Sequence, residues 1–367
     1  MQSQLHFEPK DSRSESKAPR LSELEPKQVA ECFVLLNGKE RNKTREGKPY
    51  FRVNFRDNVR TVTTMVWSDS AFFADCDASW QTGQFYKVRG RYVETDYGPQ
   101  FELERIRPLE PGDEAAGFCA SELVPATRFD VEAMFVEMLD IAQERIIEPL
   151  LRRLVLELLD EHQIDIKQIA AAAKNHHAFT GGYLEHVLSV TRTAVFFADK
   201  YADYYPDMQP PLNKSLVVAG AILHDIGKLR ELTYQPQGST YSAEGRLIGH
   251  ILLGRDMVRD KARTIPDFNP ETLLRLEHII VAHQNLPEWG SPISPHTPEA
   301  MLVFHADDLD AKFHELAVML QTAPQTGEEF TSRDNPLRLG IFRGLVADDP
   351  KTENRKPKSK SQRPILQ

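Results

Sequence analysis

The sequence has no long apolar run and few cysteines, and these shortages exclude several classes of protein. No stretch approaches the roughly 20 apolar residues of a membrane-spanning helix, and the first residues lack the basic-then-apolar order of a signal peptide. The three cysteines, Cys32, Cys76 and Cys119, are odd in number and do not have the spacing of a metal site. We therefore expect free thiols in a reducing compartment and predict a cytoplasmic protein without membrane contact.

An excess of basic residues is also missing, because the formal net charge is −9. This charge by itself argues weakly against a nucleic-acid partner, since phosphate contacts need a basic surface. Basic residues nevertheless gather between Lys39 and Arg45, and local clustering matters more than the total. The chain of 367 residues, 41% hydrophobic and 27% charged, has an ordinary globular composition and is long enough for two domains.

Both ends of the chain are predicted to be disordered. Residues 1–21 are polar and charged, and this composition buries too little apolar surface to offset the entropy lost on ordering. Residues 323–367 are predicted to form a largely disordered basic tail, in which the stretch from Lys351 to Gln367 contains six basic residues and one acidic residue. Such a tail is usually only solvated, and weak tethering of a nucleic acid is the alternative.

Alternating apolar and polar residues predict antiparallel strands in the first part of the chain. Candidate strands cover about residues 29–42, 49–56, 60–67, 85–94 and 100–107, and a short helical segment is expected from Asp69 to Asp75. This order is typical of an OB barrel, so we predict a small all-β OB-fold nucleic-acid-binding domain at residues 22–110. The candidate nucleic-acid-binding residues are the cations and aromatics Lys43, Arg45, Tyr50, Arg52, Trp67, Tyr92 and Tyr97. The alternative is that these aromatic residues only pack in the barrel core or at its edge.

From Asp130 the apolar residues recur at helical spacing, which predicts an all-α domain at residues 130–322 after a linker at residues 111–129. The fold class is therefore multidomain, a small all-β barrel followed by an all-α domain. The apolar helices between residues 130 and 160 suit an interface as well as an interior, so a homo-oligomer is left open.

Ligand-type side chains lie in these helical segments. His224 and Asp225 end the apolar run Leu216–Ile222, which must form a buried helix or strand, and His186 lies near the first turn of a helix predicted after Gly181. Further ligand types follow in helical settings, namely His250, His283 and Asp307. Imidazole nitrogen and carboxylate oxygen suit divalent Mn, Fe, Co, Ni or Zn. A His-Asp pair alone is not specific, but its context favours a metal centre.

The order of these residues resembles that of the HD-domain metallophosphohydrolases, a mostly helical superfamily whose pattern is H, then HD, then D. The matching residues are His186, His224, Asp225 and Asp307. A narrower resemblance, over roughly residues 22–320, is to the YhaM-type 3′→5′ exoribonucleases, in which an OB domain precedes an HD domain. The motifs that carry it, in the correct order, are His176–His186, Leu223–Lys228, Glu288–Pro292 and Asp307–Lys312.

The resemblance implies a ligand set. The residues implied for a first divalent ion are His186, His224, Asp225 and Asp307. Asp225 would bridge to a second ion, held by His250 and His283. The chain departs from the family at Gln284, where a second adjacent histidine is usual, so occupancy by one ion or by two is left open. Manganese is the expected metal, with Co, Fe, Ni or Zn as alternatives.

Asp225 and Lys228 are expected to act in catalysis. Lys228 would neutralise charge on the scissile phosphate or assist the leaving oxygen, and the alternative is a solvated lysine at a helix end. Trp289 is either a stacking platform for the terminal base or is buried under its proline-rich loop.

The predicted function is metal-dependent 3′→5′ hydrolysis of single-stranded RNA to nucleoside 5′-monophosphates, with single-stranded DNA as a further candidate substrate. One alternative is an HD phosphohydrolase that acts on a nucleotide or a nucleotide second messenger, for which a barrel with basic loops would be superfluous. Another is a non-catalytic nucleic-acid-binding protein, which the complete H, HD, D set disfavours.

Overall fold

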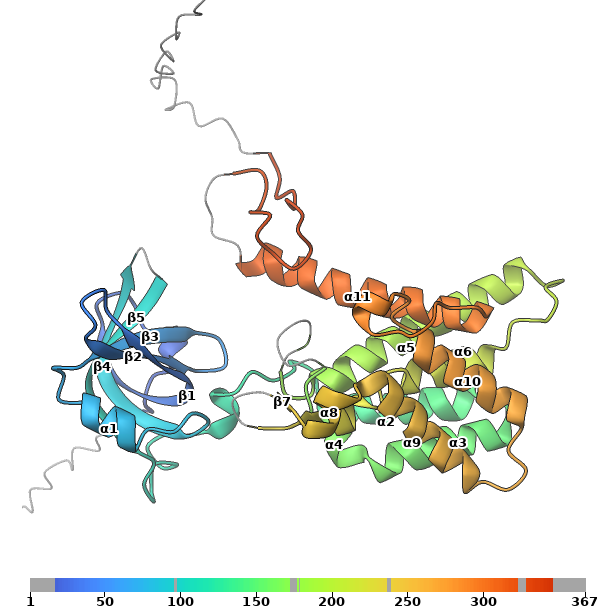
Figure 1. Ribbon diagram of the computed structural model, residues 1–367, viewed down its shortest axis with the longest axis horizontal. Helices are drawn as coiled ribbons and strands as arrows, with labels where there is room; N and C mark the ends of the chain where they lie inside the picture. The colour runs from blue at the N-terminus through green and yellow to red at the C-terminus, as the bar shows by residue number, and fades with distance from the viewer. Residues whose placement is uncertain are drawn as a thin grey trace, which may run out of the picture. The chain divides into compact units, whose positions relative to one another are not determined.

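A computed structural model describes residues 17–95, 98–171, 177, 179–235, 239–322 and 328–345 (Figure 1). The first residues of the predicted leader, 1–16, and the end of the predicted tail, 346–367, lie outside the described residues, as do Tyr97 and His176. The chain divides into two compact units, Met1–Asp310 and Ala311–Gln367.

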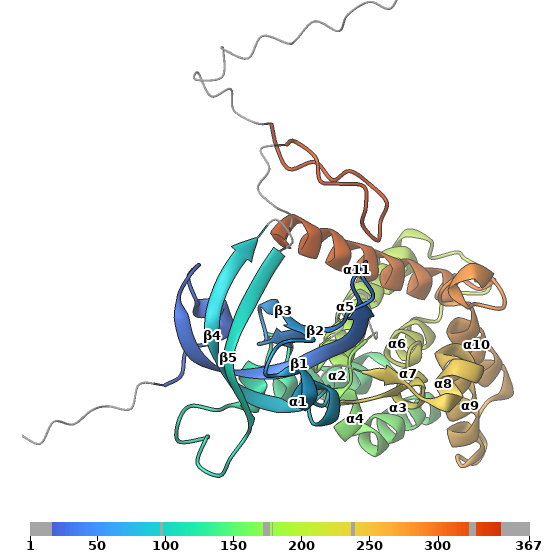
Figure 2. The same ribbon diagram turned by 60° about the vertical axis from the view of Figure 1, so that its left-hand side comes forward.

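The strands of the first unit close into a barrel, which confirms the predicted OB fold. They are β1 (Val29–Lys43), β2 (Pro49–Arg56), β3 (Thr61–Trp67), β4 (Phe85–Thr95) and β5 (Gly98–Pro108). Their order around the barrel is β1-β2-β3-β5-β4, and a parallel β3–β5 pair completes the circle (Figure 2). Five strands in this order are the Greek-key arrangement of an OB fold. The predicted helical segment is displaced: α1 spans Phe73–Ala78, because a turn closed by the Ser70 carbonyl and the Phe73 amide precedes it.

Strict alternation explains why these segments form a barrel. Along β2, Phe51, Val53 and Phe55 are buried in the barrel core, while the intervening residues are more exposed. The prediction that Leu21 belongs to a disordered leader is wrong, because its side chain is fully buried in the same core. The guanidinium of Arg60 donates to the Leu21 carbonyl at 2.6 Å, which fixes the short 3-10 helix Leu21–Glu23.

The predicted linker packs against the barrel. Leu123 is buried with Phe33 and Leu35, and Arg107 of β5 makes a bidentate contact with Asp113, with both N–O distances at 2.7 Å. The predicted linker is therefore ordered, although the exact domain boundaries stay predictions.

Helices make up most of the remainder of the first unit, and a two-stranded antiparallel sheet of β6 (Leu232–Thr233) and β7 (Thr240–Tyr241) lies between two of them in the chain. The helices are α2 (Val131–Arg145), α3 (Pro149–Glu161), α4 (Gln163–Gln168), α5 (Gly182–Tyr204), α6 (Lys214–Leu223), α7 (Lys228–Glu231), α8 (Ala243–Leu247), α9 (His250–Arg263), α10 (Pro270–Ala282) and α11 (Pro298–Thr322), the last of which continues into the second unit. Asp130 caps α2 by accepting from the Ala133 amide, which explains why the helical periodicity begins there. Helix α6 lies among the other helices, and its residues 215–223 are all buried (Figure 1). The apolar run therefore forms a buried helix.

In the second unit, part of the predicted disordered tail is ordered. Residues 328–345 contain an antiparallel bridge between Phe330 and Phe342, whose ring centroids are 5.3 Å apart. Backbone hydrogen bonds flank this bridge, from the Thr331 amide to the Ile341 carbonyl at 2.9 Å and from the Arg343 amide to the Glu329 carbonyl at 2.7 Å, so this part of the tail departs from the prediction. Among the described residues, no helix combines the length and the apolar character needed to cross a bilayer.

Candidate metal centre

The His224–Asp225 pair lies where α6 ends and the chain turns into α7. The Lys228 amide donates to the Asp225 carbonyl at 2.9 Å, which closes this turn. Gly227 lies between the pair and α9, and a Cβ added there would be 1.9 Å from the His250 carbonyl oxygen. Only glycine permits this approach, so the LHDIGK motif brings the first residue of α9 beside Asp225.

A second glycine contact positions His186. A Cβ added to Gly182 would be 2.1 Å from the carbonyl oxygen of His177, so the backbone of the preceding segment lies directly against the start of α5. His186 follows one turn later and is fully buried. The remaining predicted ligands are His283, which caps the C-terminal end of α10, and Asp307 on α11.

The structure brings all the predicted metal ligands together around Asp225. Its Oδ2 atom is 3.5 Å from Nε2 of both His186 and His224, and Oδ1 of Asp307 is 3.2 and 3.7 Å from the same two nitrogens. The Oδ1 atom of Asp225 is 3.4 Å from Nε2 of His250 and 3.5 Å from Nε2 of His283. One carboxylate therefore faces two groups of ligand atoms, which is the arrangement that a bridging ligand requires.

Two of the imidazoles are oriented by backbone carbonyls. Nδ1 of His224 donates to the Ala221 carbonyl at 2.8 Å, and Nδ1 of His283 donates to the Ile280 carbonyl at 2.7 Å. Donation from Nδ1 leaves the lone pair of Nε2 directed into the centre. Among the described residues, these two Nε2 atoms and Oδ1 of Asp225 are buried without a hydrogen-bond partner.

Carboxylates orient the other two imidazoles. Nδ1 of His186 lies 2.8 Å from Oδ2 of Asp310, which also accepts from the Ser189 hydroxyl through Oδ1. Nδ1 of His250 lies 3.1 Å from Oε1 of Glu231. A carboxylate behind a ligating imidazole fixes its tautomer and raises its basicity. Sequence reasoning missed both carboxylates, although the three-residue step from Asp307 to Asp310 places those two on one helix face.

These residues fit a divalent transition metal. A buried polar atom without a partner costs about 1–3 kcal/mol, and the centre contains several such atoms with inward lone pairs. Imidazole nitrogens combined with carboxylate oxygens are the donors that Mn, Fe, Co, Ni and Zn accept. The His and Asp clusters can therefore hold a metal ion, and the donor set does not select among these metals.

The electrostatics of the centre also favour a bound cation. Burial alone would raise the pKa of Asp225, but the Lys228 ammonium, with Nζ 2.5 Å from Oδ2, contributes to holding it well below its ordinary value. Burial would likewise lower the pKa of His186, and contacts with Asp225 and Asp307 instead raise it well above its ordinary value. Lys228 is buried and paired, so the alternative of a solvated lysine is wrong.

Gln284 lies where the resemblance leads us to expect a histidine. Its Nε2 atom is 3.3 Å from Nε2 of His250, and its Oε1 atom is buried. An amide hydrogen bond to His250 would use the same lone pair that a second ion requires. The two sides of Asp225 are therefore chemically unequal.

Trp289 lies in the 3-10 helix Pro287–Trp289 and is 50% exposed, so the alternative of burial under its loop is wrong. His278, a further histidine on α10, accepts a hydrogen bond from the His296 amide at 2.8 Å and does not belong to the centre.

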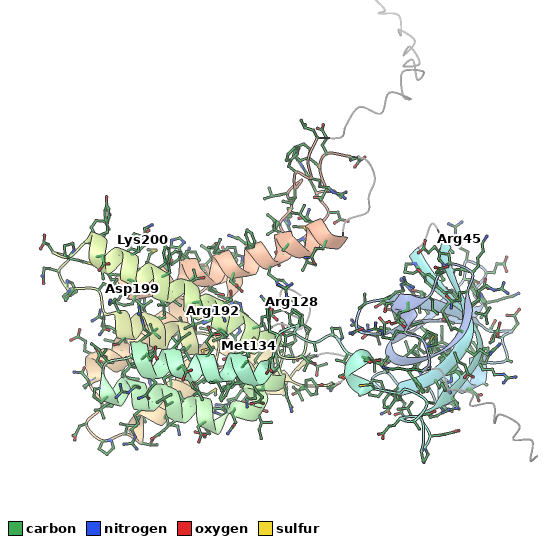
Figure 3. All side chains as sticks on the ribbon, turned by 180° about the vertical axis from the view of Figure 1, so that it is seen from behind. Arg45, Arg128, Met134, Arg192, Asp199 and Lys200 are labelled. Carbon is green, nitrogen blue, oxygen red and sulfur yellow. The ribbon has the colours of Figure 1, made fainter. Side chains whose placement is uncertain are left out.

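Most of the predicted nucleic-acid-binding residues gather on the barrel. Lys43 and Arg45 lie at the end of β1 and in the loop before β2, where Figure 3 labels Arg45. On the outer face of β2 and β3, Tyr50 pairs with Trp67, their ring centroids 5.0 Å apart, and Arg52 is the next outward residue.

The prediction that Tyr92 binds nucleic acid is wrong. Its side chain is 2% exposed in the barrel core, and its hydroxyl donates to Glu94 at 2.9 Å. The Arg60 guanidinium covers its ring at 4.4 Å. A base therefore has no access to this ring.

Comparison with known proteins assigns the family. The HD domain model matches residues 183–312, the stretch that contains every predicted metal ligand, and the predicted order of OB barrel and HD domain is confirmed. Among solved structures, the second OB-fold domain of replication protein A from Methanococcus maripaludis is similar over 25% of this chain and 94% of its own, at 15% identity and a TM-score of 0.20.

Two curated relatives match most of the chain. The 3′-5′ exoribonuclease YhaM of Bacillus subtilis (strain 168) is 30% identical over 291 residues, which cover 77% of this chain and 84% of that protein. The protein of the same name from Bacillus velezensis is 30% identical over 289 residues, 76% of this chain and 84% of its own. The chain therefore belongs to the YhaM 3′-5′ exoribonuclease family.

Proposed function

We propose that this protein is a metal-dependent 3′→5′ exoribonuclease that releases nucleoside 5′-monophosphates from single-stranded RNA. The observation that carries the proposal is the position of Asp225, whose two oxygens face two separate pairs of inward-directed imidazoles. The family relationship supports the reaction and its direction. Manganese is the metal we propose, and single-stranded DNA is a second substrate to be tested.

The ligands fall into two proposed sets that share Asp225. The first set is His186, His224, Asp225 and Asp307. The second set is Asp225, His250 and His283. A divalent ion held by such a set would bind phosphoryl oxygens and lower the pKa of an attacking water.

The chain's own residues would direct the bond changes. A water oxygen bonds to the terminal phosphorus, the bond from phosphorus to the 3′ oxygen breaks, and a proton goes to that leaving oxygen. Lys228 is the candidate for stabilising the leaving oxygen, because its ammonium lies at Asp225 and because Asp225 and other carboxylates, against the effect of burial, raise its pKa. Asp310 and Glu231 keep two imidazoles in a ligating orientation.

The barrel would hold the strand while its end is cut. The half-buried Tyr50 and the exposed Trp67 offer a surface for base stacking, and Lys43, Arg45 and Arg52 are positioned to contact phosphates nearby. The buried thiols of Cys32 and Cys76, which form no disulfide within the described residues, are consistent with action in the cytoplasm.

The test uses full-length protein stripped of metal, supplied with Mn²⁺ and given a 5′-labelled single-stranded RNA. We expect a ladder that shortens from the 3′ end and the release of mononucleotides. Asp225→Ala should abolish cleavage and leave RNA binding intact, whereas Asp256→Ala, which removes an exposed carboxylate paired with Arg255, should cleave normally. Hydrolysis of mononucleotides alone, or RNA binding without turnover by the wild type, would contradict the proposal.

A further inference from the structure

A small pocket opens beside the second set of ligands. Its volume is about 250 Å³, slightly below the roughly 300–1,000 Å³ of pockets that hold drug-sized ligands. It therefore has room for one nucleobase. The lining residues are Glu231, Ile248, Gly249, His250, Ile251, Leu252, Trp289, Gly290 and Pro292.

Apolar side chains make up part of the pocket wall, and three of them are well exposed. Ile248 is 46% exposed, Leu252 is 38% exposed and Trp289 is 50% exposed. Contiguous exposed apolar residues mark binding sites more often than inert surface. No lysine or arginine occurs among the described residues that line this pocket, so its chemistry suits a flat uncharged ring and not a phosphate.

The pocket is continuous with the candidate metal centre. His250 lines the pocket, and its Nε2 atom is 3.4 Å from Oδ1 of Asp225. Glu231, which also lines the pocket, contacts the other nitrogen of the same imidazole. His250 therefore lies between the pocket and the place where the scissile phosphate would be bound.

We propose that this pocket binds the 3′-terminal base of the RNA and that Trp289 stacks on the face of that base. The inference rests on the proposed function and identifies where the nucleotide to be released is held. The polar side chains in the lining, His250 and Glu231, are engaged with each other. Recognition therefore depends on the aromatic face and the apolar walls, which accept any of the four bases.

The first experiment measures stacking without cleavage. A single-stranded RNA that ends in 2-aminopurine is titrated with full-length protein in EDTA, and the fluorescence of this base is quenched when it stacks. We expect quenching by wild type, loss of most of it in Trp289→Ala, and recovery in Trp289→Phe. Phe196→Ala, which removes an aromatic ring that is 63% exposed and does not line the pocket, should behave as wild type. Equal quenching by wild type and Trp289→Ala overturns the proposal.

The second experiment compares RNAs whose 3′-terminal nucleotide either carries a base or is abasic. Loss of one stacking contact costs roughly 5- to 150-fold, so Trp289→Ala should lower kcat/KM by a factor in this range on the normal end and leave it unchanged on the abasic end. An equal loss on both ends would show a structural role for Trp289 and overturn the proposal. If wild-type protein quenches the fluorescence, Trp289→Ala does not, and wild type cleaves neither RNA, the proposed function is contradicted while the assignment of the pocket is supported.

Discussion

Asp310→Asn tests whether the carboxylate behind His186 supports metal binding. Asp310 accepts from Nδ1 of His186 at 2.8 Å and from the Ser189 hydroxyl. Burial would raise the pKa of this carboxyl, but hydrogen bonds from His177, His186 and Ser189 contribute to holding it well below its ordinary value, so it is ionised at neutral pH. Asparagine keeps the shape and one acceptor atom. The substitution therefore removes the charge that increases the basicity of the imidazole.

The expected loss follows from the position of Asp310 behind a ligand. Replacing the hydrogen-bond partner of a ligating histidine typically costs 10–100-fold in metal affinity, or about 1.4–2.7 kcal/mol. Metal-stripped wild type and variant are titrated with Mn²⁺ against a chelating dye, and circular dichroism verifies that both are folded. The matched control is Asp199→Asn on α5, whose carboxylate accepts from Arg145 and from Lys214 but does not contact a proposed ligand (Figure 3).

Two results would refute this reasoning. If Asp310→Asn binds Mn²⁺ within twofold of wild type, the carboxylate does not tune His186. If Asp199→Asn loses as much affinity, the effect belongs to charge removal in general and not to the contact with the imidazole.

Further predictions concern the second ion, catalysis and the linker. Gln284→His should raise the number of tightly bound Mn²⁺ ions from one toward two per chain in calorimetry, because an imidazole replaces the amide; two equally tight ions already in wild type would contradict this. Lys228→Met should lower kcat about 10²–10³-fold while the Mn²⁺ affinity stays the same or rises, since the cation that competes for Asp225 is lost; an equal fall in Mn²⁺ affinity would indicate a structural lysine. The Arg107 guanidinium holds the pKa of Asp113 at about 2, below its ordinary 3.8. This ion pair should stabilise the fold above about pH 4 and lose its effect as the pH falls through 2, so the reduction in Tm caused by Asp113→Asn should shrink over that range; a difference that persists to pH 2 would indicate a packing effect.

Periodicity and order were sufficient to predict the fold. Alternation along Phe51–Phe55 indicates which face of β2 is buried, because successive side chains of a strand point to opposite faces. The apolar run before His224 has no polar residue to expose, so it had to be buried. The ligand set was implied by the family resemblance, because His186, His224, Asp225 and Asp307 follow one another in the H, HD, D order.

Side-chain roles that depend on tertiary contacts could not be predicted in this way. Tyr92 is an aromatic residue of the kind that stacks on bases. Its position in the pairing of β4 with β5, however, directs its side chain into the barrel core. Asp310 and Glu231 resemble the many acidic residues on exposed helix faces. Only the approach of α5 to Asp310, and of α9 to Glu231, shows that each carboxylate accepts from an imidazole. Charge and spacing along one helix carry no information about the neighbouring helix.

The unequal sides of Asp225 imply an order of metal binding. On the side of His186 and Asp307, an incoming ion displaces the proton that these groups share in the metal-free protein. On the other side, it must displace the Gln284 amide from Nε2 of His250. The second event breaks a buried hydrogen bond that the ion does not replace unless the amide turns its oxygen inward. We therefore expect the first side to fill at lower metal concentration, so that Asp225 is already fixed by one ion when the second arrives.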